Sequence, residues 1–436
     1  MNPNLKTFED ILLKYIGNSI SPTLTASELK TIASDVIQLS NFFTKDREVL
    51  PPQYLNNKRL RRAYILYFLP SNIYKIHLPL KELSLHPKKI LSKKELKILD
   101  LGSGPGTTIL GILDFFSNQK KRPSLEFTAI DSVAENLSIA KDLFKLFTPL
   151  HPECPTLHGM NGKLKSSLKM PHPSKTVLTL NQVQGIQGRG VTGFTENINI
   201  DASLKTFKIN IEKAGAIPQD SYDIITLSNI LNELSYGDNK RIAERVSFLN
   251  TIIDKFLTPD GSCIIIEPAL RETTREMLEI RDSLVKNGFK IYSPCLMNQP
   301  CPALLNPKDW CHEDIPWIPP VIIKEIDKLT GLRKDSLKFS YLVLRKDKLS
   351  LTDVLEKNSY RIVSEPLISK GKIEFFICGN RGRQLITRLD KDKTPSNIQF
   401  QELQRGDIVT FKDLIDEGKR FKAGKDTIVY SSKLGN

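Results

Sequence analysis

The chain has 436 residues, 40% of them apolar and 26% charged, and its 63 Lys and Arg outnumber its 49 Asp and Glu, for a formal charge of +14. This length predicts more than one hydrophobic core, and the composition excludes a largely disordered or fibrous chain. No segment approaches the ~20 apolar residues that span a bilayer, and MNPNLKTFEDILLKYIGNS resembles neither a secretory signal nor an Arg-rich transit peptide. We expect an intracellular protein, and the basic charge favours a polyanionic partner such as RNA, although a generally basic proteome would give the same charge.

Residues 1–95 predict a helical region, because apolar residues recur there at three- and four-residue spacing. Thr25 followed by Glu28 has the spacing of a capping box at a helix start. Basic residues gather at the start of a third predicted helix: Lys58, Arg59, Arg61 and Arg62. This cluster fits either an RNA contact or a solvated helix face.

From residue 96 to residue 335, short apolar strands alternate with amphipathic helices, which predicts a parallel, doubly wound α/β sheet. One long segment, residues 151–217, breaks this alternation. It is rich in Gly, Asn, Thr and alternating β-formers. We interpret it as an insertion within the sheet domain, and a β-ribbon is one structure that this pattern fits.

The sequence ILDLGSGPG places Gly102, Gly104 and Gly106 between a predicted strand and a predicted helix, with Asp100 before them and Asp131 at the end of the next strand. Such glycines let the backbone turn sharply and approach a ligand closely. A structural turn and a dinucleotide loop are the alternatives, but the third glycine comes one residue early for G-x-G-x-x-G. The spacing resembles the S-adenosylmethionine (SAM) loop of Rossmann-like methyltransferases. That resemblance implies that the loop receives the methionine part of SAM and that Asp131 accepts hydrogen bonds from the ribose hydroxyls.

The fourth predicted strand ends in SNILNEL, which is the methyl-transfer position of such enzymes. It has neither the Asn/Asp-Pro-Pro-aromatic run of base-amine methyltransferases nor the Pro-Cys of pyrimidine C5 methyltransferases. Asn229, Asn232 and Glu233 could line a pocket, and Asn229 is a cofactor-binding candidate, but a helix start explains these residues equally well. No catalytic residue is assigned. Three residues near the third strand are candidates for contacting the adenine: Asp201, Asn210 and Glu212.

Six cysteines in a large intracellular chain do not indicate a disulfide scaffold. Four are candidates for one site: Cys295, Cys301, Cys311 and Cys378. The first three lie in the proline-rich segment 294–312 and lack the paired C-x2–4-C spacing of zinc fingers. The pattern suits an iron–sulfur cluster, while zinc held by three cysteines and His312, or unliganded thiols, are alternatives. Cys263 is expected to be a buried apolar residue, and Cys154 has no partner pattern.

Residues 336–436 contain short alternating runs separated by turn residues, which predicts a small β-barrel-like domain. From Gly331 to Asn436 the chain has 22 Lys and Arg against 14 Asp and Glu, so this domain is expected to be basic. The expected RNA contacts are Arg381, Arg383, Arg388, Lys419, Arg420 and Lys422.

Motifs spread over residues 60–380 resemble the methyltransferase-like assembly factors of the mitochondrial small ribosomal subunit and their bacterial relatives. The matching segments are AYILYFLPSNIYKIHLPLKEL, ILDLGSGPG, SNILNEL, PCLMNQPCP with DWCH, KFSYLVLRK and RIVSEPLISKGKIEFFICG. The resemblance implies a Rossmann-like SAM methyltransferase fold, small-subunit rRNA and the immature small ribosomal subunit as partners, and a 4Fe-4S cluster on the four candidate cysteines. Two features depart from the family: Glu313 follows Trp-Cys-His where an aromatic residue is common, and the insertion is unusually long.

The resemblance leaves two functions to consider. The first is an assembly factor that binds small-subunit rRNA with SAM and the cluster in supporting roles, and the second is an active SAM-dependent rRNA methyltransferase. Because no presequence is evident, we expect the bacterial cytoplasm rather than the mitochondrial matrix.

Overall fold

The computed structural model describes residues 11–13, 15–16, 24–46, 54–148, 200–212, 216–235 and 237–432. Most of the predicted insertion, including Cys154, therefore lies outside the described residues. None of the described helices is both long enough and apolar enough to cross a membrane.

An eight-stranded sheet forms the centre of the protein, with the strand order β3-β2-β1-β4-β5-β8-β6 and with β7 paired to β8. Its strands are β1 (Glu95–Leu101), β2 (Ser124–Asp131), β3 (Ala202–Lys208), β4 (Tyr222–Ser228), β5 (Leu257–Pro268), β6 (Ile291–Ser293), β7 (Glu313–Pro316) and β8 (Ser336–Arg345). Strands β1 to β5 pair in parallel, whereas β8 runs antiparallel to β5, β6 and β7. The predicted doubly wound sheet is confirmed. The strand order reverses between β1 and β4, and in such sheets ligands bind at the carboxyl ends of the strands beside this switch point.

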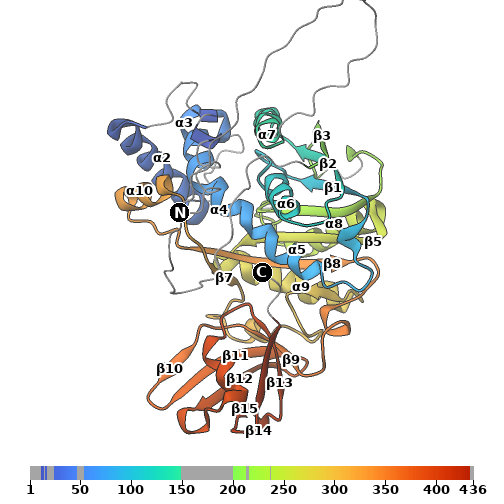
Figure 1. The fold of residues 1–436 in the computed structure, drawn as a ribbon. Helices are drawn as coiled ribbons and strands as arrows, with labels where there is room; N and C mark the ends of the chain where they lie inside the picture. Colours follow the sequence, from blue (N-terminus) through green and yellow to red (C-terminus); the bar gives the residue numbers. More distant parts are fainter. Residues whose placement is uncertain are drawn as a thin grey trace, which may run out of the picture.

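Helices cover both faces of this sheet (Figure 1). One face is covered by α6 (Thr107–Ser117) and α7 (Ala134–Phe147), and the other by α8 (Arg241–Phe256) and α9 (Arg271–Lys286). Side chains alternate along each strand, so Ile98 packs into the first core and its neighbour Leu99 into the second.

The N-terminal region is helical, as predicted, and packs on the α6 side of the sheet. Its elements are α2 (Ala26–Thr44), η2 (Tyr54–Asn56), α3 (Lys58–Ala63), the π-helical turn η3 (Tyr64–Phe68), α4 (Leu69–Ile73), η4 (Tyr74–Ile76), α5 (His77–Leu83) and η5 (Ile90–Ser92). The capping box at Thr25 and Glu28 is confirmed, since the Glu28 N–H donates to the Thr25 hydroxyl at 3.2 Å and the Thr25 N–H to the Glu28 carboxylate at 2.9 Å. The later helix α10 (Val321–Thr330) lies beside α2 and completes this region (Figure 1).

Two strands of the central sheet lie in segments that we predicted from the sequence to lie outside it. β3 lies within the segment predicted as an insertion, although it pairs with β2 in register from Ala202 onward. β8 was expected to begin the C-terminal domain, but it lies between β5 and β6 because its apolar residues are buried on both faces. We therefore propose a boundary between the two domains after Arg345, with the other predicted limits kept.

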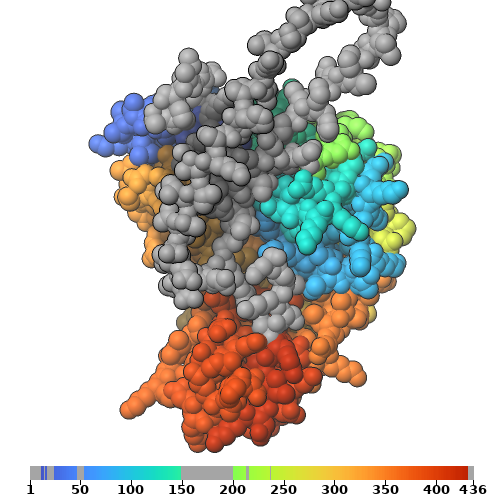
Figure 2. All heavy atoms as spheres, viewed as in Figure 1, coloured from blue at the N-terminus to red at the C-terminus, as the bar shows by residue number. Residues whose placement is uncertain are grey.

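The C-terminal part is a second sheet that curls around its own core and forms a lobe below the rest of the molecule (Figure 2). Its order is β14-β15-β12-β11-β9-β13-β16, with β10 paired to β11. Its strands are β9 (Ser359–Ile362), β10 (Leu367–Ser369), β11 (Lys372–Gly379), β12 (Gly382–Leu389), β13 (Ile408–Lys412), β14 (Ile415–Asp416), β15 (Arg420–Ala423) and β16 (Ile428–Ser432). Four short 3-10 turns accompany the later strands: η7 (Pro302–Leu305), η8 (Leu351–Asp353), η9 (Asp390–Asp392) and η10 (Pro395–Glu402). The strand order is linear, so the expected barrel-like domain is a curled sheet with β14 and β16 at its two ends.

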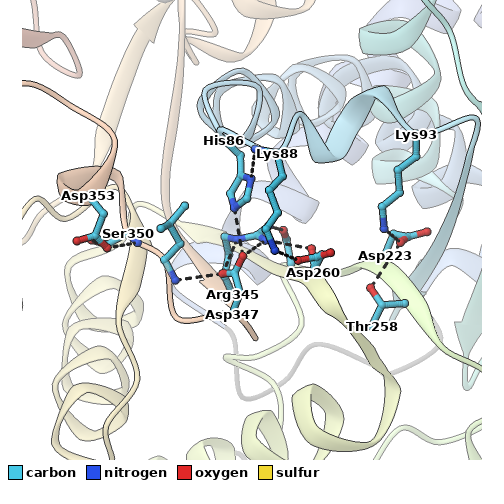
Figure 3. Close-up of polar contacts among 12 residues, drawn as sticks. His86, Lys88, Lys93, Asp223, Thr258, Asp260, Arg345, Asp347, Ser350 and Asp353 are labelled. Atoms are coloured by element: carbon cyan, nitrogen blue, oxygen red, sulfur yellow. Dashed lines mark hydrogen bonds and ion pairs between the residues drawn. The ribbon is translucent and has the colours of Figure 1, made fainter.

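The amino edge of the central sheet carries a network of paired charges (Figure 3). The buried Arg345 at the end of β8 donates to the Asp347 carboxylate at 3.0 Å, to the Ser262 hydroxyl at 2.7 Å and to the Asp260 carbonyl at 3.1 Å. His86 Nδ1 accepts the Lys88 N–H at 3.2 Å, so its Nε2 carries the proton and donates to Asp347, also at 3.2 Å. Each of the charged side chains named here therefore meets an opposite charge or a polar partner.

Candidate functional site

The glycine loop connects β1 to α6 at the switch point of the sheet. Its three glycines, Gly102, Gly104 and Gly106, all have positive φ angles. A Cβ at Gly102 would lie 2.5 Å from an Ile230 side-chain carbon, so only glycine fits there. Among the described residues, a Cβ at Gly104 would meet no atom within 4 Å. The loop therefore packs closely at its start and faces open space at its centre.

Asp131 ends β2 beside this loop and fixes its shape. Its Oδ2 accepts the Gly104 N–H at 2.9 Å, while its Oδ1 accepts the Val133 N–H at 2.8 Å and the Asn136 amide at 3.1 Å. Burial raises the pKa of Asp131, although these hydrogen bonds act in the opposite direction. A carboxylate has about four lone-pair sites, so Asp131 can still accept a further hydrogen bond.

Asp100 lies under the loop and is almost completely buried. Its Oδ1 accepts the Thr226 hydroxyl at 2.6 Å, but its Oδ2 has no hydrogen-bond partner among the described residues. Burial raises the pKa of Asp100 to about 7. The buried Ser103 hydroxyl in the loop itself also has no hydrogen-bond partner in the part of the chain that the structure describes. Unsatisfied buried polar groups are uncommon and often mark the place of an absent ligand or water.

The N-terminal helices extend over this edge of the sheet. Tyr54 on η2 lies close enough to Asp131 for that charge, together with burial, to raise the tyrosine's pKa. A pocket of about 380 Å³ opens beside Asp131, between the start of α3, the start of α7 and the end of β3. Residues lining it include Asn56, Lys58, Arg61, Ser132, Val133 and Lys208. All three arginines of the predicted basic cluster are paired: Arg59 with Asp35, Arg61 with Glu135 and Arg62 with Glu28.

The SNILNEL segment after β4 lies next to the glycine loop, as predicted, but Asn232 has a structural partner. The Asn232 amide donates to the buried Glu267 carboxylate, which also accepts the Leu231 N–H at 2.9 Å. Asn229 has a positive φ of 56°, and its N–H donates to the Ile266 carbonyl at 2.8 Å. Glu233 is exposed. Of these candidates, Asn232 is thus held within the fold.

The three candidates for contacting the adenine lie at two different edges of the sheet. Asp201 precedes β3 and therefore lies at the amino edge, away from the loop, which corrects its candidacy. Asn210 and Glu212 follow β3 at the carboxyl edge, where the Glu212 N–H donates to the Asn210 side-chain oxygen at 3.0 Å. Only these two remain on the same edge as Asp131.

Three charged residues at this edge were not identified from the sequence. Lys75 on η4 lies near Glu267 at the end of β5 and Lys334 just before β8. Burial, with repulsion from Lys334, lowers the pKa of Lys75 to about 7. Burial raises the pKa of Glu267 to about 7. The one sequence signal for Lys75 is a lysine inside the otherwise apolar run NIYKIHL.

The four candidate cysteines line one cavity between the two sheets. They come from the loop after β6 and from β11: Cys295, Cys301, Cys311 and Cys378. His312, Arg281 and Arg361 also line this cavity. Cys263 lies elsewhere, fully buried in β5 among apolar residues, as expected.

Burial and mutual repulsion favour the protonated thiol at three of these cysteines, Cys301, Cys311 and Cys378. Burial, together with the neighbouring cysteines, raises the pKa of Cys301 to about 11 and that of Cys378 to about 12. The same causes raise the pKa of Cys311 well above its ordinary value. Burial lowers the pKa of His312 to about 4, and its ring stacks on Trp310 at 5.7 Å. Within the described residues, no three His, Cys, Asp or Glu side chains are placed to hold a single metal ion.

Arginines of α9 fix the path of the cysteine loop. The fully buried Arg281 donates to the carbonyls of Met297 and Gln299, at 2.5 Å each. Arg275 donates to four carbonyls further along: Ala303, Leu304, Asn306 and Asp309. The Cys301 N–H donates to Asp282 at 2.9 Å. Backbone contacts to one helix therefore hold three of the cysteines near one another.

The predicted RNA contacts of the C-terminal domain are mostly used within the fold. Four of these six side chains form ion pairs: Arg381 with Asp416, Arg383 with Asp309, Arg420 with Glu417 and Lys422 with Asp392. Arg388 is 1% exposed and donates to the Asn397 carbonyl at 3.1 Å, so its predicted role in RNA contact is wrong. Only Lys419 has no side-chain partner among the described residues.

A family model described as mitochondrial small ribosomal subunit Rsm22 matches residues 192–427, which is more than half of the chain. The chain belongs to the Rsm22 family. The match covers the central sheet from before β3 as well as most of the C-terminal sheet. No curated protein matches this Rsm22-family chain.

Solved structures overlap the Rsm22-family chain only loosely. The plantazolicin methyltransferase BamL, solved with a substrate analogue and S-adenosylhomocysteine, shares 12% identity over 73% of this chain and 98% of its own, with a TM-score of 0.32. A protein from Listeria monocytogenes described as a class I SAM-dependent methyltransferase shares 11% identity over 79% of this chain and 88% of its own, with a TM-score of 0.35. A chain of the fibrillarin/Nop5p complex shares 13% identity over 58% of this chain and 73% of its own, with a TM-score of 0.26. The fold assignment therefore rests on the strand order itself.

Proposed function

We propose that this Rsm22-family protein is an assembly factor of the small ribosomal subunit that binds SAM at its glycine loop and contacts small-subunit rRNA. The observation that carries this proposal is the Rsm22 match across both sheets, since the family's description names the small ribosomal subunit. The chain's charge of +14 supports a nucleic-acid partner. The sequence predicts the bacterial cytoplasm, and the family's description names the mitochondrial subunit; in either compartment we propose the same partner.

The glycine loop fits SAM in three respects. The space above Gly104 is open, the buried Asp100 Oδ2 has no partner, and Asp131 retains the capacity to accept a hydroxyl hydrogen bond. SAM would supply an activated methyl group. We propose that the loop backbone receives its methionine part, that Asp131 binds its ribose, and that the pocket next to Asp131 takes its adenine. Asn229 would line the methionine end, beside Ile230.

We propose that the cysteine cavity holds a 4Fe-4S cluster rather than a zinc ion. A zinc ion draws its ligands to about 2.0–2.3 Å from one point, and no such grouping exists within the described residues. A cluster binds each thiolate at a different iron, so its ligands stand farther apart while still lining one cavity. The four thiols line one cavity, which supports this proposal, and the Arg281 and Arg361 guanidinium groups in the same lining would offset the thiolate charge. We propose these four cysteines as the ligands, with zinc as the runner-up.

An active rRNA methyltransferase is the second candidate, and the charged residues near SNILNEL favour it. Both functions share the SAM site and the RNA partner, so one comparison tests them together. Tagged protein is crosslinked to RNA in cells, and the recovered RNA is sequenced. Enrichment of small-subunit rRNA over large-subunit rRNA is expected. Equal recovery of both would contradict the proposed partner.

Calorimetry with purified protein tests the SAM site separately. Binding of SAM and of S-adenosylhomocysteine is expected, whereas a dinucleotide should not bind. A map of rRNA modifications in cells with and without the gene then distinguishes an enzyme from a factor that only binds.

A further inference from the structure

Two lysine-rich segments lie side by side at the amino edge of the central sheet. Residues 88–97 contain five lysines and one glutamate, and residues 120–122 contain two lysines and one arginine. The second segment leads into β2, which pairs in parallel with β1 and places Ser124 opposite Glu95. The Ser124 N–H also donates to the Lys94 carbonyl at 2.8 Å. The fold therefore joins two basic segments that are separated in the sequence by the whole of α6.

Ion pairs fix the first segment but neutralise only part of its charge. The pairs are Lys88 with Asp260 at 2.8 Å, Lys93 with Asp223 at 2.5 Å (both in Figure 3) and Lys97 with Asp220 at 3.3 Å. Between the first two pairs, the side chains of Ile90 and Leu91 are buried, and the Ser92 N–H donates to the Lys89 carbonyl at 2.8 Å. The backbone that carries the other lysines is thus held in place before any partner arrives, which reduces the entropy cost of binding.

Four lysines of the two segments remain unpaired on the surface. Lys89, Lys94, Lys120 and Lys121 are exposed, and none forms an ion pair with another described residue. We call these four residues the lysine edge. Glu95 is the one carboxylate within the two segments, so positive charge dominates here.

The lysine edge extends across several strands. Lys120 and Lys121 precede β2, Lys94 precedes β1, and Lys89 follows Lys88, which is paired to Asp260 on β5. The sheet order from β2 to β5 is β2-β1-β4-β5, and neighbouring strands are about 4.8 Å apart, so the row spans roughly 15 Å. Nucleic-acid backbones carry a phosphate every few ångströms, so a row of this length faces several phosphates.

The surroundings of the lysine edge favour a phosphate backbone over other partners. Among the described residues, none of the exposed large apolar side chains lies within residues 86–97 or 118–124. Protein interfaces depend on buried aromatic and other large anchor residues, and single-stranded RNA is held by aromatic rings on which its bases stack. Double-stranded RNA is recognised mostly by its shape and by contacts to phosphates and 2′-hydroxyls, for which lysines suffice.

We propose, on the basis of the proposed rRNA partner, that the lysine edge binds the phosphate backbone of a double-stranded segment of small-subunit rRNA. The C-terminal arginines that the sequence suggested for this role form ion pairs within the fold or, like Arg388, are buried. The lysine edge lies at the amino ends of the strands, whereas the glycine loop lies at their carboxyl ends. RNA bound at the lysine edge therefore anchors the protein without occupying the proposed SAM site.

The test measures binding of the full-length protein to a labelled duplex copied from a small-subunit rRNA helix, at several salt concentrations. One variant carries glutamine at all four positions of the lysine edge, and a second carries arginine there, which keeps the charge. The control variant removes the same number of charges from exposed lysines of the C-terminal domain: Lys370→Gln, Lys391→Gln, Lys393→Gln and Lys425→Gln.

The glutamine variant of the lysine edge should bind the duplex about ten- to a hundredfold more weakly than the wild type. Each lost phosphate contact reduces the slope of log affinity against log salt by about 0.9, so four contacts reduce it by roughly 3 to 4. The arginine variant and the control variant should keep the wild-type affinity and slope. The wild type should bind the duplex more tightly than oligouridine of the same length. SAM affinity by calorimetry should be the same in all of these proteins, which also shows that the variants are folded.

Four results would overturn the inference and leave the proposed function intact. They are duplex binding by the glutamine variant like that of the wild type, equal losses in the glutamine and control variants, equal wild-type affinity for the duplex and for oligouridine, and displacement of the duplex by polyglutamate at equal charge concentration. The last result would indicate an acidic protein as the partner of this surface. Wild-type protein that binds neither the duplex nor intact small-subunit rRNA would overturn the proposed rRNA partner as well.

Discussion

At the amino edge of the central sheet, the Arg345 guanidinium meets the Asp347 carboxylate, the Ser262 hydroxyl and the Asp260 carbonyl, whereas at the carboxyl edge the equally buried Asp100 keeps one oxygen without a partner. The amino edge is also where Lys88 pairs with Asp260 (Figure 3). A buried charge thus has its partners at one edge of the sheet, whereas at the other edge a buried carboxylate oxygen has no partner among the described residues.

The comparison teaches how to distinguish a structural polar group from a functional one. A buried charge that has all its partners stabilises the fold when it is left intact and is costly to break. A buried polar group without partners lowers stability unless something else binds it. The glycine loop lies at the carboxyl edge and the cysteine cavity lies between the two sheets, so these two places are where we expect ligands.

The largest expected effect is at the cysteine cavity. Replacing Cys378 by Ser removes one of four proposed ligands, so anaerobically purified Cys378→Ser should lose iron that the wild type carries at about four atoms per chain. Metal analysis and visible absorption measure this change, and Cys263→Ser, in the apolar core, should keep its iron. Stoichiometric zinc in the wild type would mean a zinc site. Iron retained in Cys378→Ser would point to His312 as a ligand instead.

At the amino edge, Arg345→Met should destabilise the protein by about 3–5 kcal/mol, because the Asp347 carboxylate and the Asp260 carbonyl lose their buried partner. Urea unfolding measures this effect. Arg333→Met is the matched control, since Arg333 forms an exposed pair with Asp335 worth about 1 kcal/mol or less. SAM affinity should not change in either variant. Equal unfolding free energies for Arg345→Met and Arg333→Met would remove the contrast between the two edges.

Asp131→Ala should weaken SAM binding by roughly ten- to a hundredfold, because each hydrogen bond to a charged group is worth about 1.5–3 kcal/mol. The glycine loop should also loosen, since the Gly104 N–H loses its acceptor. Calorimetry compares this variant with Asp142→Ala, which alters an exposed carboxylate on α7. Equal SAM affinity in the two variants would remove Asp131 from the site.

The smallest effect concerns Asp100 and pH. The unfolded chain releases this proton near the ordinary pKa of about 4, whereas the folded protein holds it up to a pKa of about 7. Between these values the folded state binds more protons, so the stability of the wild type falls as pH rises. Asp100→Asn should lack this fall and gain about 1–2 kcal/mol relative to the wild type between pH 5 and pH 7. If the unfolding free energy changed equally between pH 5 and pH 7 in the wild type and in Asp100→Asn, Asp100 would not titrate in this range.

Local patterns allowed the glycine loop, the end of β2 and the capping box at Thr25 to be predicted from the sequence. Each depends on residues a few positions apart, whose spacing directly sets the backbone. β8 was assigned to the wrong sheet because an alternating apolar run is compatible with either sheet. Its partners β5 and β6 come earlier in the sequence, so the run itself does not identify them. Lys75, Glu267 and Lys334 were missed for the same reason, since they come from distant parts of the sequence and are brought to one edge only by the tertiary fold. Amino-acid composition likewise gave no indication that the C-terminal arginines form ion pairs within the fold.

The position of β8 between β5 and β6 has a consequence for the order in which the protein is made. Within the described sheet, β6 pairs with β8, and Cys295 follows β6 directly. During translation, the loop with three of the cysteines emerges before its supporting strand, and Cys378 emerges later still, in β11. The four thiols can meet only after β11 has left the translating ribosome. A chain that carries the proposed cluster on all four cysteines has therefore been translated at least as far as β11, so cluster content can report on incomplete products in a purified sample.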